Sequence, residues 1–294
     1  MVERTLATAM PSARDLSLLT IGVVAVGTSG PLIAASALAI PIMIFWRNFV
    51  GAAVSLPFAF RALTFERPST AALRLSLLSG LLLAAHFIAF FTAMRWTNVA
   101  AGTALAALQP VFAALFAVAQ KHHVPRRAWY GMAIAFLGVI MIGGVDYTIS
   151  SRALLGDFAG VMAALLGAAY VSVVSNARKS LTTSVQTTVC YATCAAVMAI
   201  VMIVMNLPFS GYSTRDWLII LGLIIGAQLL GHSIFNFVLK TASATIVSMI
   251  VLFETPVAAV IAALWLGQLP RLEIYPAIVL LLLGSALVVV RYED

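Results

Sequence analysis

The sequence predicts an all-α membrane protein of ten transmembrane helices, arranged as two inverted five-helix repeats around a central cavity. Three observations lead to this fold class: an apolar composition, evenly spaced apolar runs and an internal repeat. Of 294 residues, 63% are hydrophobic and only 9% are charged, and the mean hydropathy is +1.07. A soluble domain carries roughly 25% charged residues, so this chain lacks the polar residues that would cover a globule in water.

The apolar runs are continuous rather than alternating, which predicts helices rather than the strands of a barrel. Each run is close to the ~20 residues that cross a hydrocarbon core of ~30 Å. In chain order, we expect helices over 16–36, 39–60, 72–94, 98–120, 126–144, 157–177, 183–206, 216–239, 243–265 and 272–290.

The basic residues indicate the orientation of these helices. A net charge of +7 would suggest nucleic acid as the partner of a soluble protein, but here the basic residues lie in short connections between apolar runs. We therefore expect a lipid bilayer and no nucleic acid. If both termini are cytoplasmic, twelve Lys and Arg lie inside and four outside, the latter being Arg95, Arg152, Arg215 and Arg271. This bias predicts cytoplasmic termini by the positive-inside rule.

An internal repeat divides the chain into 16–144 and 157–290. At an offset of 146 residues, rare residue types fall in register. The matched pairs are Gly80 with Gly226, His86 with His232, and Pro110 with Pro256. Because each half has five helices, an odd number, the second half must enter from the opposite side of the membrane. Inverted repeats are typical of alternating-access transporters, whose site lies near the midplane between the halves.

Several motifs resemble those of a known family. They are Pro41 to Arg47, Leu108-Gln109-Pro110-Val111, Gly131 to Val139, Phe253-Glu254-Thr255-Pro256 and Leu266-Gly267-Gln268. Together they resemble the drug/metabolite transporter superfamily, EamA-type permeases, over nearly the whole chain. The resemblance implies export of amino acids or other metabolites across a bacterial inner membrane. Gln268 departs from the glutamate that the family often has there, so a role of that glutamate does not carry over.

Four ionisable side chains lie within predicted spans, namely Arg47, His86, His232 and Glu254. Such groups are costly in lipid and usually face a cavity or a partner. We expect Arg47 to hold a carboxylate and Glu254 to be polar or proton-sensitive. The alternatives are a structural arginine and a packed, protonated glutamate. The histidines are expected to line one cavity, and the alternative is that each is a core residue.

The two histidine helices predict unlike walls of this cavity. Gln228, His232 and Asn236 form a polar stripe, whereas Leu82, His86 and Phe90 form an apolar one unless the phenylalanine faces lipid. This pattern favours an amphipathic substrate with one polar end. Trp46 and Tyr170 are further candidate wall residues, with packing roles as the alternative. Pro110 and Pro256 are candidate bending points within their helices.

Motifs for nucleophilic catalysis, phosphate binding or dinucleotide binding are absent from the sequence. We therefore expect no enzyme and no cofactor. The predicted function is secondary transport of a small-molecule substrate, a neutral or aromatic amino acid, out of the cell by a functional monomer. A multidrug or other metabolite permease is the alternative, and an intramembrane enzyme or scaffold is the alternative of another class.

Overall fold

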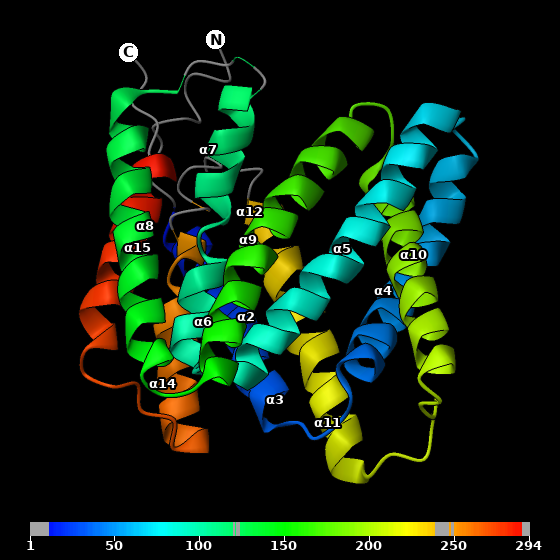
Figure 1. The fold of residues 1–294 in the computed structure, drawn as a ribbon. Helices are drawn as coiled ribbons and strands as arrows, with labels where there is room; N and C mark the ends of the chain where they lie inside the picture. Colours follow the sequence, from blue (N-terminus) through cyan, green and yellow to red (C-terminus); the bar gives the residue numbers. More distant parts are fainter. Residues whose placement is uncertain (1–11, 120, 122–123, 239–246, 248–249, 290–294) are drawn as a thin grey trace.

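The computed structural model describes residues 12–119, 121, 124–238, 247 and 250–289, and it describes no side chain for residues 232, 233, 236 and 237. The described residues fold into helices joined by short connections, with no strand among them (Figure 1). The helices of the first half are α2 (Ala13–Gly27), α3 (Ser29–Ala35), α4 (Ile40–Leu63), α5 (Thr70–Trp96), α6 (Val99–Ala106), α7 (Gln109–Ala119) and α8 (Arg126–Tyr147). Those of the second half are α9 (Ser151–Ala177), α10 (Thr183–Val204), α11 (Thr214–Gly222), η1 (Leu223–His232), α12 (Ser233–Val238), α14 (Glu254–Leu266) and α15 (Ile274–Val289).

Eight helical segments of the described chain are long and apolar enough to cross a membrane, counting α2 with α3, α6 with α7, and α11 with η1. Two shorter apolar helices, α14 and α15, follow. Part of the ninth predicted helix, 243–265, lies outside the described residues. The all-helical membrane fold is thus confirmed, and the count of ten spans stays a prediction.

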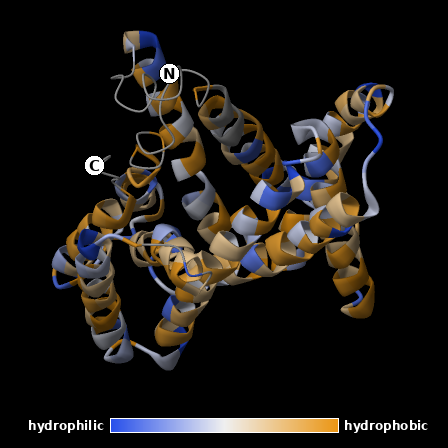
Figure 2. Ribbon diagram, turned by 90° about the horizontal axis from the view of Figure 1, so that it is seen from above, coloured by the Kyte–Doolittle hydropathy of each residue, from blue (hydrophilic) through white to orange (hydrophobic). Residues whose placement is uncertain are grey.

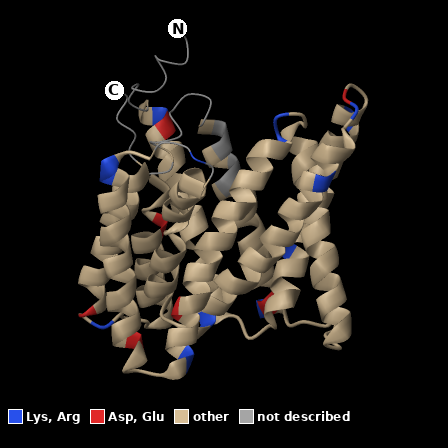
Figure 3. Ribbon diagram, turned by 45° about the horizontal axis from the view of Figure 1, so that its top comes forward, with Lys and Arg blue, Asp and Glu red and all other residues tan. Residues whose placement is uncertain are grey.

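The surface and ends of the bundle agree with a membrane environment. Large apolar side chains point outward, among them Phe58, Val204 and Leu264, which are 65%, 74% and 84% exposed. Figure 2 shows hydrophobic residues predominating along the helices, and Figure 3 shows the charged residues gathered towards the two ends of the bundle. A soluble monomer rarely exposes so much contiguous apolar surface.

Three of the predicted spans are broken, and each break precedes a proline. Thr28 separates α2 from α3, Ala107 and Leu108 separate α6 from α7, and α14 begins at Glu254. Pro31, Pro110 and Pro256 then stand in the first turn of the following helix, where a missing N–H costs no helical hydrogen bond. Pro110 and Pro256 were expected within continuous helices, and the structure instead places them at helix starts.

Two other segments differ from expectation. The helix predicted over 157–177 begins at Ser151, so Arg152, expected in a connection, is helical. The helix predicted over 216–239 consists of α11, the π-helix η1 and α12 in succession. A π-helical stretch widens the helix and is frequent at functional sites.

The two halves make equivalent helix contacts when they are matched at the offset of 146 residues. A contact between two helices recurs between the counterparts of those helices in the other half. α5 packs on α9, and its counterpart segment η1 packs on α2, which is the counterpart of α9. Likewise α7 packs on α9, and its counterpart α14 packs on α2. Finally, α4 packs on its own counterpart α10, and α8 on its own counterpart α15. These are the contacts that an internal two-fold axis requires.

The pair α8 and α15 packs through backbone atoms. A Cβ added at Gly131 would lie 2.6 Å from the carbonyl oxygen of Gly284, and one at Gly138 would lie 2.7 Å from that of Ala277. Glycines let membrane helices approach this closely. The contact places the last helices of the two halves directly side by side.

Candidate functional site

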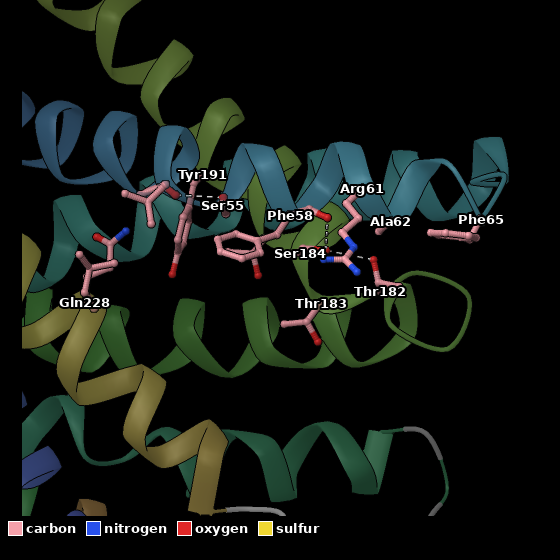
Figure 4. Close-up of a pocket in the computed structure, with 14 residues that line it drawn as sticks. Ser55, Phe58, Arg61, Ala62, Phe65, Thr182, Thr183, Ser184, Tyr191 and Gln228 are labelled. Atoms are coloured by element: carbon pink, nitrogen blue, oxygen red, sulfur yellow. Dashed lines mark hydrogen bonds between the residues drawn. The ribbon is translucent and has the colours of Figure 1, made fainter.

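A pocket of about 730 Å³ lies between α4, α10 and η1. Its walls combine hydroxyl groups with apolar side chains, and Arg61 is the one charged residue among the described residues that line it. The lining residues are Gly51, Val54, Ser55, Phe58, Arg61, Ala62, Phe65, Thr182, Thr183, Ser184, Thr187, Tyr191, Gln228 and Leu229. Figure 4 shows Gln228 and Tyr191 at one end of this pocket and Phe65 at the other. The volume is in the range of small-molecule sites.

The positions of the lining residues along α4 show in which direction the pocket extends. Gly51 lies near the middle of the helix, and Phe58 and Arg61 lie in its last two turns. The pocket therefore runs from the interior of the bundle to the end of α4. There, the Glu66 carboxylate accepts hydrogen bonds from the backbone N–H and the hydroxyl of Thr182, at 3.2 and 2.9 Å, and so ties the α4–α5 connection to the start of α10.

Arg47 lies just beyond the inner end of the pocket, one helical turn before Gly51. It is 3% exposed. Its Nε donates to Oε1 of Gln228 at 3.0 Å, and its Cζ lies 4.6 Å from the centroid of the Phe87 ring. The guanidinium is thus held by an amide from the second half of the chain and by an aromatic face, a favourable partner for a buried cation.

Gly51 makes room for the Gln228 amide. A Cβ at position 51 would overlap Gln228 Nε2 and would lie 2.9 Å from Cδ2 of Tyr191. Gln228 is 5% exposed, and its Nε2 is buried without a hydrogen-bond partner among the described residues. An unsatisfied buried donor is costly, so this amide is available to a ligand that brings an acceptor.

Glu254 lies near Arg47 but is not its ion-pair partner. Glu254, Tyr170 and Tyr191 are close enough to Arg47 to interact with it electrostatically. No carboxylate oxygen of a described residue lies within 4.0 Å of the guanidinium, and Nε is bonded to Gln228 instead. Tyr170 packs against the core cluster that contains Phe87 and Cys190.

His86 joins α5 to α9. Its Nδ1 lies 2.8 Å from the carbonyl oxygen of Ala163, and because a carbonyl only accepts, Nδ1 carries a proton. The ring lies 6.1 Å from that of Phe90, which is itself 9% exposed, and Leu82 is partly buried on the same helix. Among the proposed binding-site residues whose side chains the structure describes, Gln228 alone lines the pocket.

The side chains of His232 and Asn236 lie outside the described residues, although their backbone belongs to η1 and α12. Their shared cavity with His86 therefore stays a prediction. Trp46 lies on the other side of Arg47 from the pocket, where its indole N–H donates to the carbonyl oxygen of Phe209 at 3.2 Å.

Sequence reasoning missed Gly51 and Tyr191. One signal was available for the first, because Gly51 and Ser55 follow Arg47 at intervals of four and so share its helix face. Nothing in the sequence separates Tyr191 from the many other aromatic residues. Within the described ranges, no group of three His, Cys, Asp or Glu residues is placed to hold a metal ion.

Comparisons with known proteins agree with this fold. One solved chain, described as "Crystal structure of protein", is similar with a TM-score of 0.63 and 18% identity, over 94% of this chain and 97% of that chain. At this identity the likeness concerns the fold alone. No protein of curated function matches the chain.

A family model matches the chain twice, over residues 15–144 and 154–290. The two matches cover nearly all the helices described above and give the chain a two-repeat architecture. The family consists of membrane transporters, which agrees with a buried polar site at the end of a pocket between the repeats. The chain belongs to the EamA-like transporter family.

Proposed function

We propose that this protein is a secondary transporter that exports a small amphipathic metabolite, a neutral or aromatic amino acid, by alternating access. The observation that carries the proposal is the buried Arg47 guanidinium, bonded across the repeats to Gln228 at the inner end of a pocket. A buried cation with no carboxylate partner among the described residues needs a compensating anion at least part of the time. The carboxylate of an amino acid supplies one.

The contact pattern supports alternating access. The contacts between helices recur between their counterparts, as an internal two-fold axis requires. Because consecutive spans alternate in direction, five spans per repeat would leave the two repeats inverted relative to each other. Arg47 belongs to the first repeat and Gln228 to the second. A substrate that binds both would be sensitive to the movement of one repeat against the other.

The walls of the pocket favour an amphipathic anion. The described residues of its lining supply six hydroxyl groups, several apolar side chains and Arg61, but no Asp or Glu. Hydroxyls and the free Nε2 of Gln228 would bind polar atoms near the carboxylate, while the apolar walls would hold a side chain. We propose that one chain suffices, in a bacterial inner membrane with both termini in the cytoplasm, so that the pocket opens to the cytoplasm.

The alternative is a multidrug or other metabolite permease. The exposed rings of Phe58 and Phe65 at the outer part of the pocket favour it, because they would accept a larger apolar molecule. The two functions differ in their need for the guanidinium. A hydrophobic drug without an anionic group would be carried equally well by an Arg47→Lys variant, whereas a carboxylate would lose its two-pronged hydrogen bond.

The test is uptake of a panel of radiolabelled amino acids and of cationic and neutral drugs into proteoliposomes. We expect saturable transport of neutral or aromatic amino acids, with a KM raised at least tenfold in Arg47→Lys. The matched control is Arg74→Lys, an exposed arginine on α5, which should transport normally. Amino-acid transport that is unchanged in Arg47→Lys, or transport of drugs alone, would rule out the carboxylate role.

A further inference from the structure

A cluster of aromatic rings lies at the start of α4, on the opposite side of Arg47 from the pocket. Its members come from α4, from the α10–α11 connection and from α11. This cluster consists of Phe45, Trp46, Phe49, Phe209, Tyr212 and Trp217. None of these residues lines the pocket.

The rings contact one another across the two repeats. The centroid of Trp46 lies 5.1 Å from that of Trp217, and the centroid of Phe45 lies 5.2 Å from that of Phe209, both pairs edge to face. Tyr212 lies 5.4 Å from Trp217. These are favourable separations for aromatic pairs, so these ring contacts join α4 to the second repeat.

One hydrogen bond fastens the same junction. The Trp46 indole N–H donates to the carbonyl oxygen of Phe209 at 3.2 Å, and the Tyr212 hydroxyl donates to the carbonyl oxygen of Pro208 within the connection. Burial raises the pKa of the Tyr212 phenol, while its contact with Trp46 acts in the opposite direction. Tryptophan and tyrosine at a membrane interface often face lipid headgroups, but here the indole donor is occupied by the opposing repeat.

The order of residues along α4 places this cluster in relation to the pocket. Trp46 is in the second turn, Arg47 follows directly, and the pocket begins at Gly51 and ends beyond Arg61. From Trp46 to Arg61 the helix rises about 22 Å at 1.5 Å per residue. The pocket therefore extends towards the end of α4, and the aromatic rings lie near the start of the same helix.

We propose that the aromatic cluster is the gate that closes the Arg47 site from the face of the membrane opposite the pocket. This inference rests on the proposed transport function and assigns one of its moving parts. Trp46 and Arg47 are consecutive residues of one rigid helix, so a movement of α4 that changes the bonds of Arg47 also displaces Trp46 from Phe209 and Trp217. Substrate binding and gate opening are thereby coupled without any intermediate element.

The test uses cysteine reactivity and needs no substrate. Cys194 lies half-way along α10, is 0% exposed and interacts electrostatically with Arg47, so it lies between pocket and gate. A protein with Cys190→Ala keeps Cys194 as the single thiol. A second protein, with Cys190→Ala, Cys194→Ala and Thr187→Cys, reports on the pocket itself. Both are reconstituted in vesicles of defined orientation and treated with a membrane-impermeant methanethiosulfonate.

We expect Thr187→Cys to react only from the face where residues 64–69 lie, and Cys194 to be inert from both faces. Phe209→Ala and Trp217→Ala should each raise the reaction rate of Cys194 from the face of residues 206–213 at least tenfold. Trp217→Phe should keep the gate closed. Trp129→Ala, at a half-exposed tryptophan of α8, is the matched control and should change nothing.

The rate of Thr187→Cys serves as a check on folding, since an intact pocket keeps it unchanged in every variant. Phe209 lies in a connection and is 38% exposed, so its truncation is expected to be tolerated. Cys194 that stays inert in both gate variants with a normal Thr187→Cys rate would overturn the gate. So would a gate-intact protein whose Thr187→Cys reacts equally from both faces. A protein that passes these tests yet transports no amino acid would refute only the proposed substrate.

Discussion

Gly51→Ala is a minimal change that separates the binding site from the fold. The new methyl would overlap Gln228 Nε2 and lie 2.9 Å from Tyr191 Cδ2. The Gln228 amide is the end of a flexible side chain, so it gives way rather than the backbone. Its Oε1 then moves away from Arg47 Nε, which is now 3.0 Å away. Once this distance exceeds ~3.5 Å, the hydrogen bond is lost.

Two free energies change in this variant, the helix propensity of residue 51 and the hydrogen bond between Arg47 and Gln228. Alanine favours a helix over glycine by roughly 0.5–1 kcal/mol. Loss of the bond to Gln228 costs between about 0.6 kcal/mol, the mean for hydrogen bonds between membrane helices, and ~3 kcal/mol, the upper value for a charged partner. The first term acts on folding. The second acts on the site, so we expect a near-normal melting temperature and a KM raised between about threefold and a hundredfold.

The assay is proteoliposome transport alongside a thermal melt of the purified protein in detergent. Gly144→Ala is the control, because a Cβ at Gly144 of α8 meets no atom within 4 Å. That control should transport normally and melt at the same temperature or slightly higher. Gly51→Ala with the KM of the parent protein would refute the role assigned to the Arg47–Gln228 bond, and a loss of folding would refute the claim that the amide yields easily.

Three further predictions concern stability and orientation. Arg95→Ala should destabilise the fold by about 2 kcal/mol or more, because Arg95 donates to the carbonyl oxygens of Ile33, Ser36 and Leu38. In the same thermal melt, Arg152→Ala, at an exposed arginine, should cost less than ~1 kcal/mol. Equal losses of stability in the two variants would contradict this prediction. Glu66→Ala should cost ~1 kcal/mol by removing the two hydrogen bonds that Thr182, the N-cap residue of α10, donates to its carboxylate; Glu273→Ala, at an exposed residue, should be neutral. A reporter enzyme that is active only outside the cytoplasm should be silent when fused to the C-terminus, and strong activity there would reverse the proposed orientation.

Sequence reasoning located the spans because burial in lipid imposes a length and a composition on each of them. It failed where the backbone departs from the α-helix. The break before Gln109 depends on where Pro110 removes a hydrogen bond, and the sequence predicted one helix over 98–120. The π-helix at Leu223–His232 depends on how η1 packs against α2 and α4, and no local pattern marks it.

The site was predicted in part. Arg47 and Gln228 stood out because polar groups are rare in spans, and the structure brings them together. The depths of Arg47 and Glu254 along their predicted helices would allow the two side chains to pair, yet in the structure Arg47 Nε is bonded to Gln228 instead. The depth of a residue along its helix does not show which faces of two helices meet. The helices that pack against α4 decide which of its faces meets Glu254 or Gln228. The role of Trp46 was open for the same reason, since a cavity wall and a packed core need the same kind of ring.

The close contact of α8 with α15 limits what can move. Helices that slide past each other need a layer of side chains that can change rotamers, and here Gly131, Gly138 and Gly284 leave carbonyl oxygens directly against the opposite backbone. A shift of even one residue, ~1.5 Å along the axis, would drive a neighbouring Cβ into such an oxygen. The last helices of the two repeats, α8 and α15, thus behave as one rigid unit. Any rocking of one repeat against the other must pivot about this unit, and the ends of α4 and α10 then move furthest.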